Sequence, residues 1–486
     1  ASQTKIEKTA MSCGITVKIR KFMTDNENNN YSDYVRRVAE ADDEADARRR
    51  TCQSASDGAD SAPRDQVPPA DAEVRDASRG SGGMIALARR LFGGDRVLWV
   101  IIISLMIISV LVVYSSTAKM AYNARSAIST AQFLRSQLFL LALCIIALFF
   151  VHRVNSVTYR KLSTPLFALS LLLTASVYFM GVTTNGAARW IPLFGFQFQP
   201  SEMLKVTLVM YLAQQLAARQ STVRTMQIVP SLQFWTWMQP KQRRVWREGG
   251  LSIFVPIVLS CMVIMPAHTS SAVLAFVLSL AMLYIGRVRW SEIFRLVKWA
   301  VAGAALVALL GLGRSQTAHG RISTWLELWT TPRMEIPVDE LTDTERSMIA
   351  IYSGGILGRG AGQSAVRVEM THPESDYAFA FFVEEYGIGI AMILIALYVW
   401  VFFRAIEIFE RCPKKSPAML SLGIALLITG QALLHIMVTV NIIPETGQTL
   451  PMISRGGSSL LFTAIGLGMI LSVSRQTEEG SHSEDV

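Results

Sequence analysis

Ionisable side chains occur in this sequence next to stretches that are otherwise apolar, and these residues are the best suited to chemistry. The segment NGAARWIPLFGFQFQPSEMLK contains Arg189, Glu202 and Lys205. The glutamate and the lysine are three residues apart and therefore share one face of a helix, which predicts an ion pair. Charge at membrane depth is costly, so such a pair usually faces a cavity or a partner, although it can also simply pack two helices together. Arg189 suits either a phosphate contact or an anchor at the lipid headgroups.

A second acidic group lies in the segment HPESDYAFAFFVEEYG. His372 and Asp376 precede a long apolar run, and Glu384 and Glu385 lie about two helical turns further along. We expect at least one of these two glutamates to face a polar cavity or to pair with a base such as Lys205 or Arg189. The preceding segment, IAIYSGGILGRGAG, supplies glycines for tight turns and for close approach of the backbone to a ligand.

A third segment, PETGQTLPMISRGGSSLL, is rich in neutral donors and acceptors. It contains Gln448 and Ser458, and two prolines interrupt its backbone between two apolar runs. Irregular polar backbone at membrane depth is tolerated only beside protein or water, so this segment also predicts a cavity. Arg455 suits phosphate recognition or anchoring to headgroups.

The elements that must position these residues are membrane-spanning helices. The chain has 486 residues, of which 51% are hydrophobic and 17% charged, whereas a soluble protein carries about 25% charged residues. A span needs roughly 20 mostly apolar residues. Ten such runs lie near residues 97–116, 134–152, 163–181, 201–217, 251–266, 271–285, 299–312, 377–403, 418–440 and 458–473. The predicted fold class is an all-α polytopic bundle of about ten transmembrane helices, with a long outer loop (residues 313–375) between spans seven and eight.

Basic residues identify the cytoplasmic side of this predicted bundle. Lys and Arg precede span one and then gather in every second connection, after spans two, four, six and eight. Such loops face the cytoplasm, so both termini are predicted to be cytoplasmic and the three chemistry-bearing segments to lie outside. The same bias accounts for the net charge of +9, and we predict no nucleic-acid partner. The five cysteines are scattered and predict neither a disulfide nor a metal site.

The predicted domains follow from this organisation. Residues 1–90 are polar and poor in aromatic side chains, which predicts a disordered cytoplasmic tail. The tail has no apolar region typical of a signal peptide, and its alternative role is to dock a partner. Residues 91–476 form the ten-span domain, and residues 477–486 form a short cytoplasmic tail.

The chain resembles the SEDS family of bacterial shape, elongation, division and sporulation proteins, which includes FtsW and RodA. The segments NGAARWIPLFGFQFQPSEMLK, IAIYSGGILGRG, HPESDYAFAFFVEEYG and PETGQTLPMISRGGSSLL resemble the signature blocks of this family and occur in the family's order. The similarity extends from about Arg96 to Arg475. Its details, notably GQTLPMISRGGSS and the long N-terminal tail, are closer to the division member FtsW than to RodA.

The resemblance implies a peptidoglycan glycosyltransferase of the bacterial inner membrane, which polymerises lipid II at the outer face during cell division. It also implies a class B penicillin-binding protein transpeptidase as partner, together with other divisome proteins. In that reaction a sugar hydroxyl displaces undecaprenyl pyrophosphate, which requires a base and either protein cations or a divalent metal such as Mg²⁺ or Mn²⁺. The substrate-binding residues expected from the resemblance are Arg189, Glu202, Lys205, His372, Asp376, Glu384, Gln448, Arg455 and Ser458.

The sequence departs from the family at the catalytic carboxylate. The family places it in a segment resembling Trp-x-x-Pro-x-x-Asp-Pro, but here the stretch reads LWTTPRMEIPVDELTDTERSMIAIYSGG and lacks the Asp-Pro pair. The candidates are Asp339, then Glu335, and also Asp343, and each is alternatively a solvated loop charge. Many members carry Pro-Asp and then Gly-Thr between spans five and six, where MPAHTSSAVL leaves His268 as the polar residue. Arg455 replaces an aromatic residue found in many relatives.

Two other functions compete with a polymerase. A lipid II flippase would also need ten spans and polar outer segments, but inverted repeats typical of transporters are not evident in the sequence. A catalytically weak scaffold that recruits a transpeptidase is the second alternative, and the altered loop carboxylate favours it.

Overall fold

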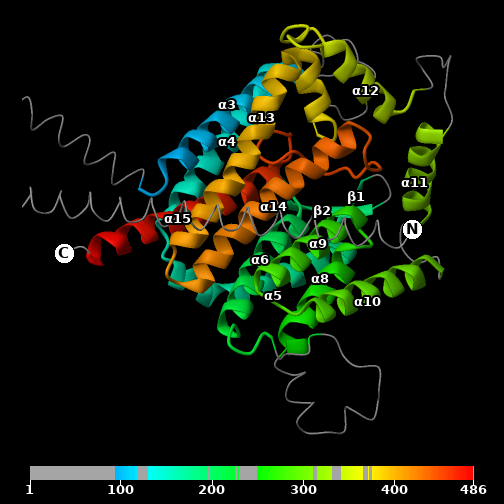
Figure 1. Ribbon diagram of the computed structural model, residues 1–486. Helices are drawn as coiled ribbons and strands as arrows, with labels where there is room; N and C mark the ends of the chain where they lie inside the picture. The colour runs from blue at the N-terminus through cyan, green and yellow to red at the C-terminus, as the bar shows by residue number, and fades with distance from the viewer. Residues whose placement is uncertain are drawn as a thin grey trace, which may run out of the picture. The chain divides into compact units, whose positions relative to one another are not determined.

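The computed structural model describes residues 93–117, 130–184, 187–193, 196–224, 228, 249–309, 315–330, 341–364, 370 and 375–484. All of these belong to one compact unit, Ala86–Val486, and most are helical (Figure 1). The predicted N-terminal tail lies outside the described residues, as do three of the candidate site residues, Glu335, Asp339 and His372.

Each of the ten predicted spans coincides with a helix. These helices are α3 (Arg96–Thr117), α4 (Thr130–Arg153), α5 (Ser156–Met180), α6 (Pro200–Ala218), α8 (Val255–Ile264), α9 (Thr269–Ile285), α10 (Trp290–Leu309), α13 (Ala378–Arg411), α14 (Lys415–Thr439) and α15 (Gly457–Glu484). A π-helical turn, η2 (Gly250–Phe254), precedes α8.

Within the described part of the chain, six helices are long and apolar enough to cross a membrane: α3, α4, α5, α13, α14 and α15. The helices α8 and α9 are apolar but shorter, while α6 and α10 carry charged residues in their N-terminal halves. A polytopic helical membrane protein is therefore confirmed, and the count of ten spans stays a prediction.

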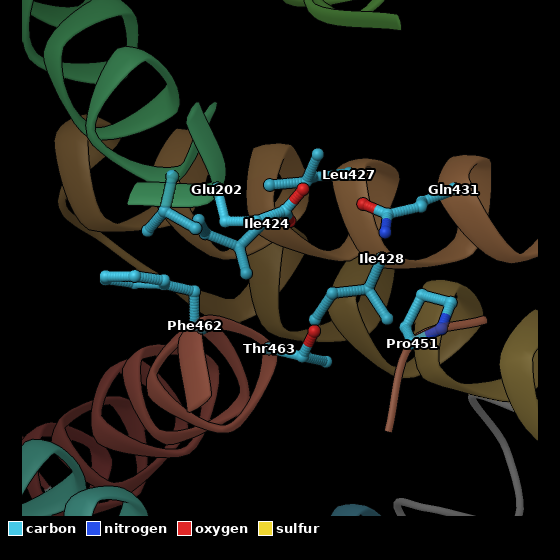
Figure 2. A pocket seen from close by; sticks show the side chains of 10 residues that line it. Glu202, Ile424, Leu427, Ile428, Gln431, Pro451, Phe462 and Thr463 are labelled. Carbon is cyan, nitrogen blue, oxygen red and sulfur yellow. The ribbon is translucent and has the colours of Figure 1, made fainter. Parts of the chain in front are cut away.

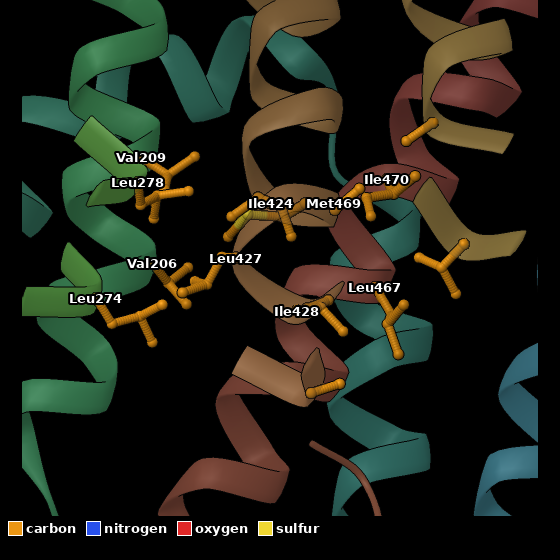
Figure 3. Close-up of a cluster of buried hydrophobic side chains, with 14 of the residues drawn as sticks. Val206, Val209, Leu274, Leu278, Ile424, Leu427, Ile428, Leu467, Met469 and Ile470 are labelled. Carbon is orange, nitrogen blue, oxygen red and sulfur yellow. The ribbon is translucent and has the colours of Figure 1, made fainter. Parts of the chain in front are cut away.

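The centre of the bundle is formed by α14 and α15. Of their candidate spans, 67% and 83% are buried, compared with 28–44% in α3, α4, α5 and α13. The helix α14 packs against α6, α9, α13 and α15 (Figure 1). Gly423 allows the close approach of α14, because a Cβ at this position would lie 2.7 Å from Val209 and 2.6 Å from Met282. Figure 3 shows part of the resulting apolar core, which includes Val206, Val209, Leu274, Leu278, Ile424, Leu427, Ile428, Leu467, Met469 and Ile470.

The predicted outer connections contain more regular structure than the sequence indicated. The loop after α5 forms an antiparallel meander of β1 (Val182–Thr184), β2 (Ala187–Leu193) and β3 (Phe196–Phe198). The connection predicted as one long loop contains α11 (Ser315–Thr330) and α12 (Asp343–Gly354). A capping box of Thr342 and Glu345 starts α12. The fold is therefore helical with one small sheet, and not entirely α.

Three helices are joined at the end of the bundle that the sequence predicts to be cytoplasmic. Asp95 Oδ1 accepts a hydrogen bond from the Val97 amide at 2.8 Å, which caps the start of α3. Its Oδ2 lies 2.6 Å from Arg404 Nη2 of α13, and its amide donates to Ser474 Oγ of α15 at 3.0 Å. The carboxylate and the backbone amide of Asp95 therefore join α3, α13 and α15 at this end of the bundle.

Candidate functional site

The ion pair predicted at the start of α6 is present. Lys205 Nζ lies 2.9 Å from Glu202 Oε1, and both side chains are buried. Pro200 occupies the first position of α6, where its missing N–H leaves no donor unsatisfied. The same ammonium group donates to Gln431 Oε1 of α14 at 3.0 Å. Lys205 is therefore held between two helices by one charged and one neutral acceptor.

A small pocket lies beside this pair. Both partners of Lys205, the Glu202 carboxylate and the Gln431 amide, line it, and the remaining lining is largely apolar. Figure 2 shows that the lining side chains come mainly from α14 and α15, with Glu202 contributed by α6. The apolar and small lining residues are Val206, Ile424, Leu427, Ile428, Pro451, Phe462, Thr463 and Gly466.

The segment between α14 and α15, residues 441–456, borders this pocket and is called the outer turn below. Gln431 Nε2 donates to the backbone oxygen of Thr449 at 3.1 Å. Thr449 Oγ1 lies 2.8 Å from Ser459 Oγ of α15. The amide of Gln431 therefore connects the Lys205 ammonium on one side to the outer turn on the other.

Gln448 extends the same network to the start of α9. Its Nε2 donates to Ser271 Oγ at 2.8 Å and lies 3.3 Å from His268 Nδ1. Its backbone oxygen lies 2.7 Å from Nδ1 of the buried His435. His435 Nε2 accepts from the Phe379 amide at 3.4 Å, so the outer turn is also tied to the first turn of α13.

His268 is buried at the N-terminus of α9, where its Nδ1 accepts a hydrogen bond from the Ser271 amide at 3.2 Å. Burial, together with the charges of Arg189 and Lys205, lowers the pKa of His268 to about 3. This imidazole is therefore neutral at physiological pH. It occupies the position at which the sequence departs from the family pattern.

We predict that His268 makes the protein less stable as the pH falls below 6.5. In the unfolded chain this histidine binds a proton near its ordinary pKa of 6.5, whereas the folded protein resists protonation until about pH 3. Stability is therefore lost as the pH falls from 6.5 towards 3, by about 2 kcal/mol between pH 7 and pH 5. His268→Asn retains an N-cap acceptor and should lose about 2 kcal/mol less over that interval. The free energy of unfolding in detergent micelles at both pH values is the measurement, and equal losses in the two proteins would contradict the prediction.

Arg189 and Asp376 lie close to His268. Arg189, on β2, donates through Nε to the backbone oxygen of Ala267 at 2.9 Å. A Cβ built on Gly447 would lie 3.7 Å from Asp376 Oδ2 and 4.0 Å from His268 Nε2, so both groups border the same glycine of the outer turn. Ser375 Oγ donates to Asp376 Oδ1 at 2.9 Å.

The helix α11 contributes a cation that the sequence did not single out. Arg321 Nη1 donates to the Glu445 backbone oxygen at 3.3 Å, and its Nη2 lies 3.8 Å from Glu445 Oε1. Burial raises the pKa of the Glu445 carboxyl, Arg321 lowers it, and the nearby carboxylates of Asp376 and Asp343 raise it again. Glu445 belongs to the segment PETGQTLPMISRGGSSLL, but nothing in that segment indicates Arg321 as its partner, so only the tertiary structure reveals this pair.

Of the three candidate catalytic carboxylates, Asp343 is the one within the described residues. It is the first residue of α12 and lies 3.6 Å from Arg346 Nη1, with 27% of its side chain exposed. The next residue, Thr344, has its Oγ1 3.1 Å from the hydroxyl of Tyr377. Asp343 is therefore located near Glu445 and the start of α13, on the same side as Asp376.

Glu384 and Glu385 belong to a separate cluster. Glu384 Oε1 lies 3.7 Å from Arg359 Nη1, and Glu384 also accepts a hydrogen bond from Ser364. Glu385 accepts from the Gly362 amide at 3.0 Å. One of the two glutamates thus pairs with a base, as expected, but within the described chain that base is Arg359 and not Lys205.

The two remaining candidates lie at the end of the outer turn and the start of α15. Arg455 is half-buried, and Ser458 is buried with its Oγ unpartnered among the described residues. The described residues contain no group of three or more His, Cys, Asp or Glu side chains arranged to hold a metal ion.

Comparison with known proteins shows which family contains this arrangement. Residues 95–479 match the model of the FtsW/RodA/SpoVE family, described as cell cycle proteins. The chain belongs to this family. The match includes every candidate site residue, from Arg189 to Ser458, and it excludes the predicted N-terminal tail.

Individual FtsW/RodA/SpoVE relatives agree with this assignment. The probable peptidoglycan glycosyltransferase FtsW of Neisseria gonorrhoeae is 30% identical over 335 residues, which cover 65% of this chain and 71% of that protein. The protein of the same name from Aliivibrio salmonicida is 28% identical over 67% of this chain and 76% of its own length. Stage V sporulation protein E of Bacillus subtilis is 27% identical over 79% of this chain and 97% of its own length.

Two solved structures share the fold of this FtsW/RodA/SpoVE chain. One is a chain of a peptidoglycan synthase complex studied for the coordination of polymerization and crosslinking, with a TM-score of 0.55 and 22% identity over 79% of this chain and 98% of that one. The other is the rod shape determining protein RodA of Thermus thermophilus, with a TM-score of 0.52 and 21% identity over 79% and 97%. At this level of identity the likeness concerns the fold alone.

Proposed function

We propose that this protein polymerises lipid II into the glycan strands of peptidoglycan, at the outer face of the inner membrane and during cell division. The observation that carries the proposal is the buried Lys205 ammonium, whose two partners line an apolar pocket. A cation next to an apolar pocket suits a substrate that joins a pyrophosphate to a polyprenyl chain. The names of the FtsW relatives support the same activity.

The reaction assigns distinct tasks to these residues. A carboxylate removes the proton from the 4-hydroxyl of the acceptor disaccharide, and the freed oxygen bonds to the anomeric carbon of the donor. The bond from that carbon to the pyrophosphate breaks, and its electron pair leaves with undecaprenyl pyrophosphate. Lys205 and Arg189 stabilise the negative charge that develops on the leaving group. Asp343, Asp339 and Glu335 are the candidate bases, and the outer turn orients the sugars through Gln448.

A transpeptidase of the penicillin-binding protein class B is the proposed partner. The fold is shared with a chain of a complex studied for the coordination of polymerization and crosslinking. A flippase and a scaffold remain the competing functions, and the missing Asp-Pro pair favours the scaffold.

Reconstitution distinguishes these functions. The full chain, purified with its candidate transpeptidase, is given labelled lipid II, and glycan polymer is measured by gel electrophoresis. We expect polymer from the wild-type complex and a loss of about 100-fold or more when the catalytic base is replaced. The variants are Asp339→Ala, Glu335→Ala and Asp343→Ala.

The matched control is Glu479→Ala, which removes a carboxylate that is 62% exposed at the opposite, predicted cytoplasmic end. No polymer from the wild-type complex would reject the polymerase in favour of a flippase or a scaffold. Polymer from all three variants would reject these bases and leave the polymerase in place.

A further inference from the structure

Four large apolar side chains are exposed on α12 and on the turn that follows it. The exposed fractions are 44% for Ile349, 90% for Tyr352, 77% for Ile356 and 89% for Leu357. Ile349 and Tyr352 are three residues apart and therefore share one side of α12, whereas Ile356 and Leu357 follow Gly355, whose φ of 55° ends the helix. We call these four residues the apolar patch. An apolar surface of this kind marks a protein, ligand or membrane contact.

The apolar patch is fixed to α13 by its backbone. Gly387 has non-helical dihedral angles, with φ 82°, so the hydrogen bonds of α13 are interrupted there. The turn after α12 supplies the missing partners. The Arg359 and Gly360 amides donate to the backbone oxygens of Glu384 and Glu385 at 2.9 and 3.0 Å. In the opposite direction, the Ile388 and Gly389 amides donate to the Gly355 and Ile356 oxygens at 2.9 and 3.3 Å. The turn is therefore inserted into the break of α13 and cannot move independently of it.

The exposure of α13 changes at this same break. Residues 378–385 are all buried, which shows that protein surrounds this first part of the helix. Beyond the break, Ile388, Ile390, Met392 and Ile393 are 45–59% exposed. Since α13 is long and apolar enough to span a membrane, these exposed side chains face acyl chains. From Ile388 to the exposed Phe403 the helix rises about 22 Å, which fits within the roughly 30 Å hydrocarbon thickness. The lipid-facing part of α13 therefore begins at the break.

We infer that the apolar patch inserts into one leaflet of the phospholipid bilayer, beside α13, as a short element that does not span the membrane. Lipid covers the apolar patch, because the backbone hydrogen bonds between the turn and α13 place the patch beside the lipid-facing side chains of α13. A tyrosine at the boundary and apolar side chains next to it are typical of membrane interfaces. Arg359 follows two residues after the patch, is 43% exposed and can reach headgroup phosphates while it pairs with Glu384.

The insertion has a consequence for the candidate site. The helix α12 is 12 residues long, or about 18 Å, and it carries the apolar patch at its C-terminal end and Asp343 at its N-terminal end. The patch therefore fixes the height of Asp343 above the membrane surface. This inference goes beyond the proposed polymerase activity and does not depend on it.

Spin labelling tests the insertion. The five cysteines are replaced by alanine in the full chain, and single cysteines are introduced as Tyr352→Cys or Leu357→Cys. Because both side chains are about nine-tenths exposed, labelling them displaces no core residue. After reconstitution into phosphatidylcholine–phosphatidylglycerol vesicles, the accessibility of each nitroxide to oxygen, which partitions into lipid, and to a water-soluble nickel chelate is measured.

Two positions calibrate the measurement. Ile393→Cys reports the lipid-facing surface of α13, and Gln363→Cys reports an exposed polar turn. We expect labels at 352 and 357 to have oxygen-to-nickel ratios several-fold above that of 363 and close to that of 393. A ratio at 357 equal to that at 363 would overturn the inference. Protection of 357 from both reagents would also overturn it, because protein and not lipid would then cover the patch.

Discussion

Replacing Lys205 with alanine is expected to destabilise the protein by about 3–5 kcal/mol and to abolish polymer formation. The substitution leaves the Glu202 carboxylate buried without its cation and the Gln431 oxygen without its donor. An uncompensated buried charge is among the most destabilising changes a single substitution can make. The proposed function adds a second effect, because it places the Lys205 cation near the leaving pyrophosphate, where its loss removes transition-state stabilisation. The measurements are the free energy of unfolding in micelles and polymer formation from labelled lipid II.

A double variant separates the structural role of this pair from its chemical role. Glu202→Gln combined with Lys205→Met removes both charges and keeps similar volumes, so most of the lost stability should return. Polymer formation should not return, because the cation is still absent. Recovery of both properties would show that the pair only packs α6 against α14. Lys415→Ala, at an exposed position, is the control and should change stability by less than about 0.5 kcal/mol.

The ion pair was predictable because its information is local. Glu202 and Lys205 are one helical turn apart, and Pro200 marks the start of the helix that presents them. Helix periodicity and the cost of buried charge therefore suffice to expect the contact. The positions of the spans were predictable for a similar reason, since hydrophobic length is read directly from consecutive residues.

The partners of the other charged residues were not predictable, because they come from distant segments. The sequence offered Lys205 or Arg189 as a base for Glu384 or Glu385, but the fold brings Arg359 to Glu384. Arg321 and Glu445 are 124 residues apart, and no pattern in either segment indicates that they meet. Such pairs depend on how helices pack, and packing is not encoded in local periodicity.

The outer turn shows a third case, in which the residue types were predictable and their arrangement was not. Its polar side chains indicated a cavity, and it does border the pocket through Pro451. The sequence did not reveal that Gln448 reaches His268 and Ser271, or that Gly447 lies between Asp376 and His268. Hydrogen bonds link this segment to Lys205 through Gln431 and to His268 through Gln448, and Asp376 borders its Gly447. Glu384 lies in a separate cluster.

The break in α13 was also invisible to hydropathy, because a glycine inside a long apolar run reads as part of a continuous span. In the structure, Gly387 interrupts the helix, and the turn after α12 completes its hydrogen bonds. A region that hydropathy presents as one helix and one loop is thus a single interlocked unit. The stability of this unit depends on close contact between the backbone of α13 and the backbone of the turn.

Gly387→Ala is expected to destabilise the protein by about 3 kcal/mol or more. A positive φ of 82° costs a non-glycine residue about 1–3 kcal/mol by itself. The added Cβ would also lie 2.2 Å from the Ile356 oxygen and 2.6 Å from the Gly358 amide nitrogen. These are backbone atoms of a hydrogen-bonded turn, so they cannot move aside without breaking bonds to α13. The measurement is the free energy of unfolding in micelles.

Gly389→Ala is the matched control, because its Cβ would lie 3.5 Å from the same Ile356 oxygen, at ordinary van der Waals distance. Two residues along the same helix, it should leave stability unchanged or raise it slightly, since alanine favours helix. The contrast between these two glycines isolates the break from any general effect of added volume. If the free energies of unfolding of Gly387→Ala and Gly389→Ala differed by less than about 0.5 kcal/mol, the turn would not be locked into α13. The apolar patch would then lose the contact that places it at the membrane edge.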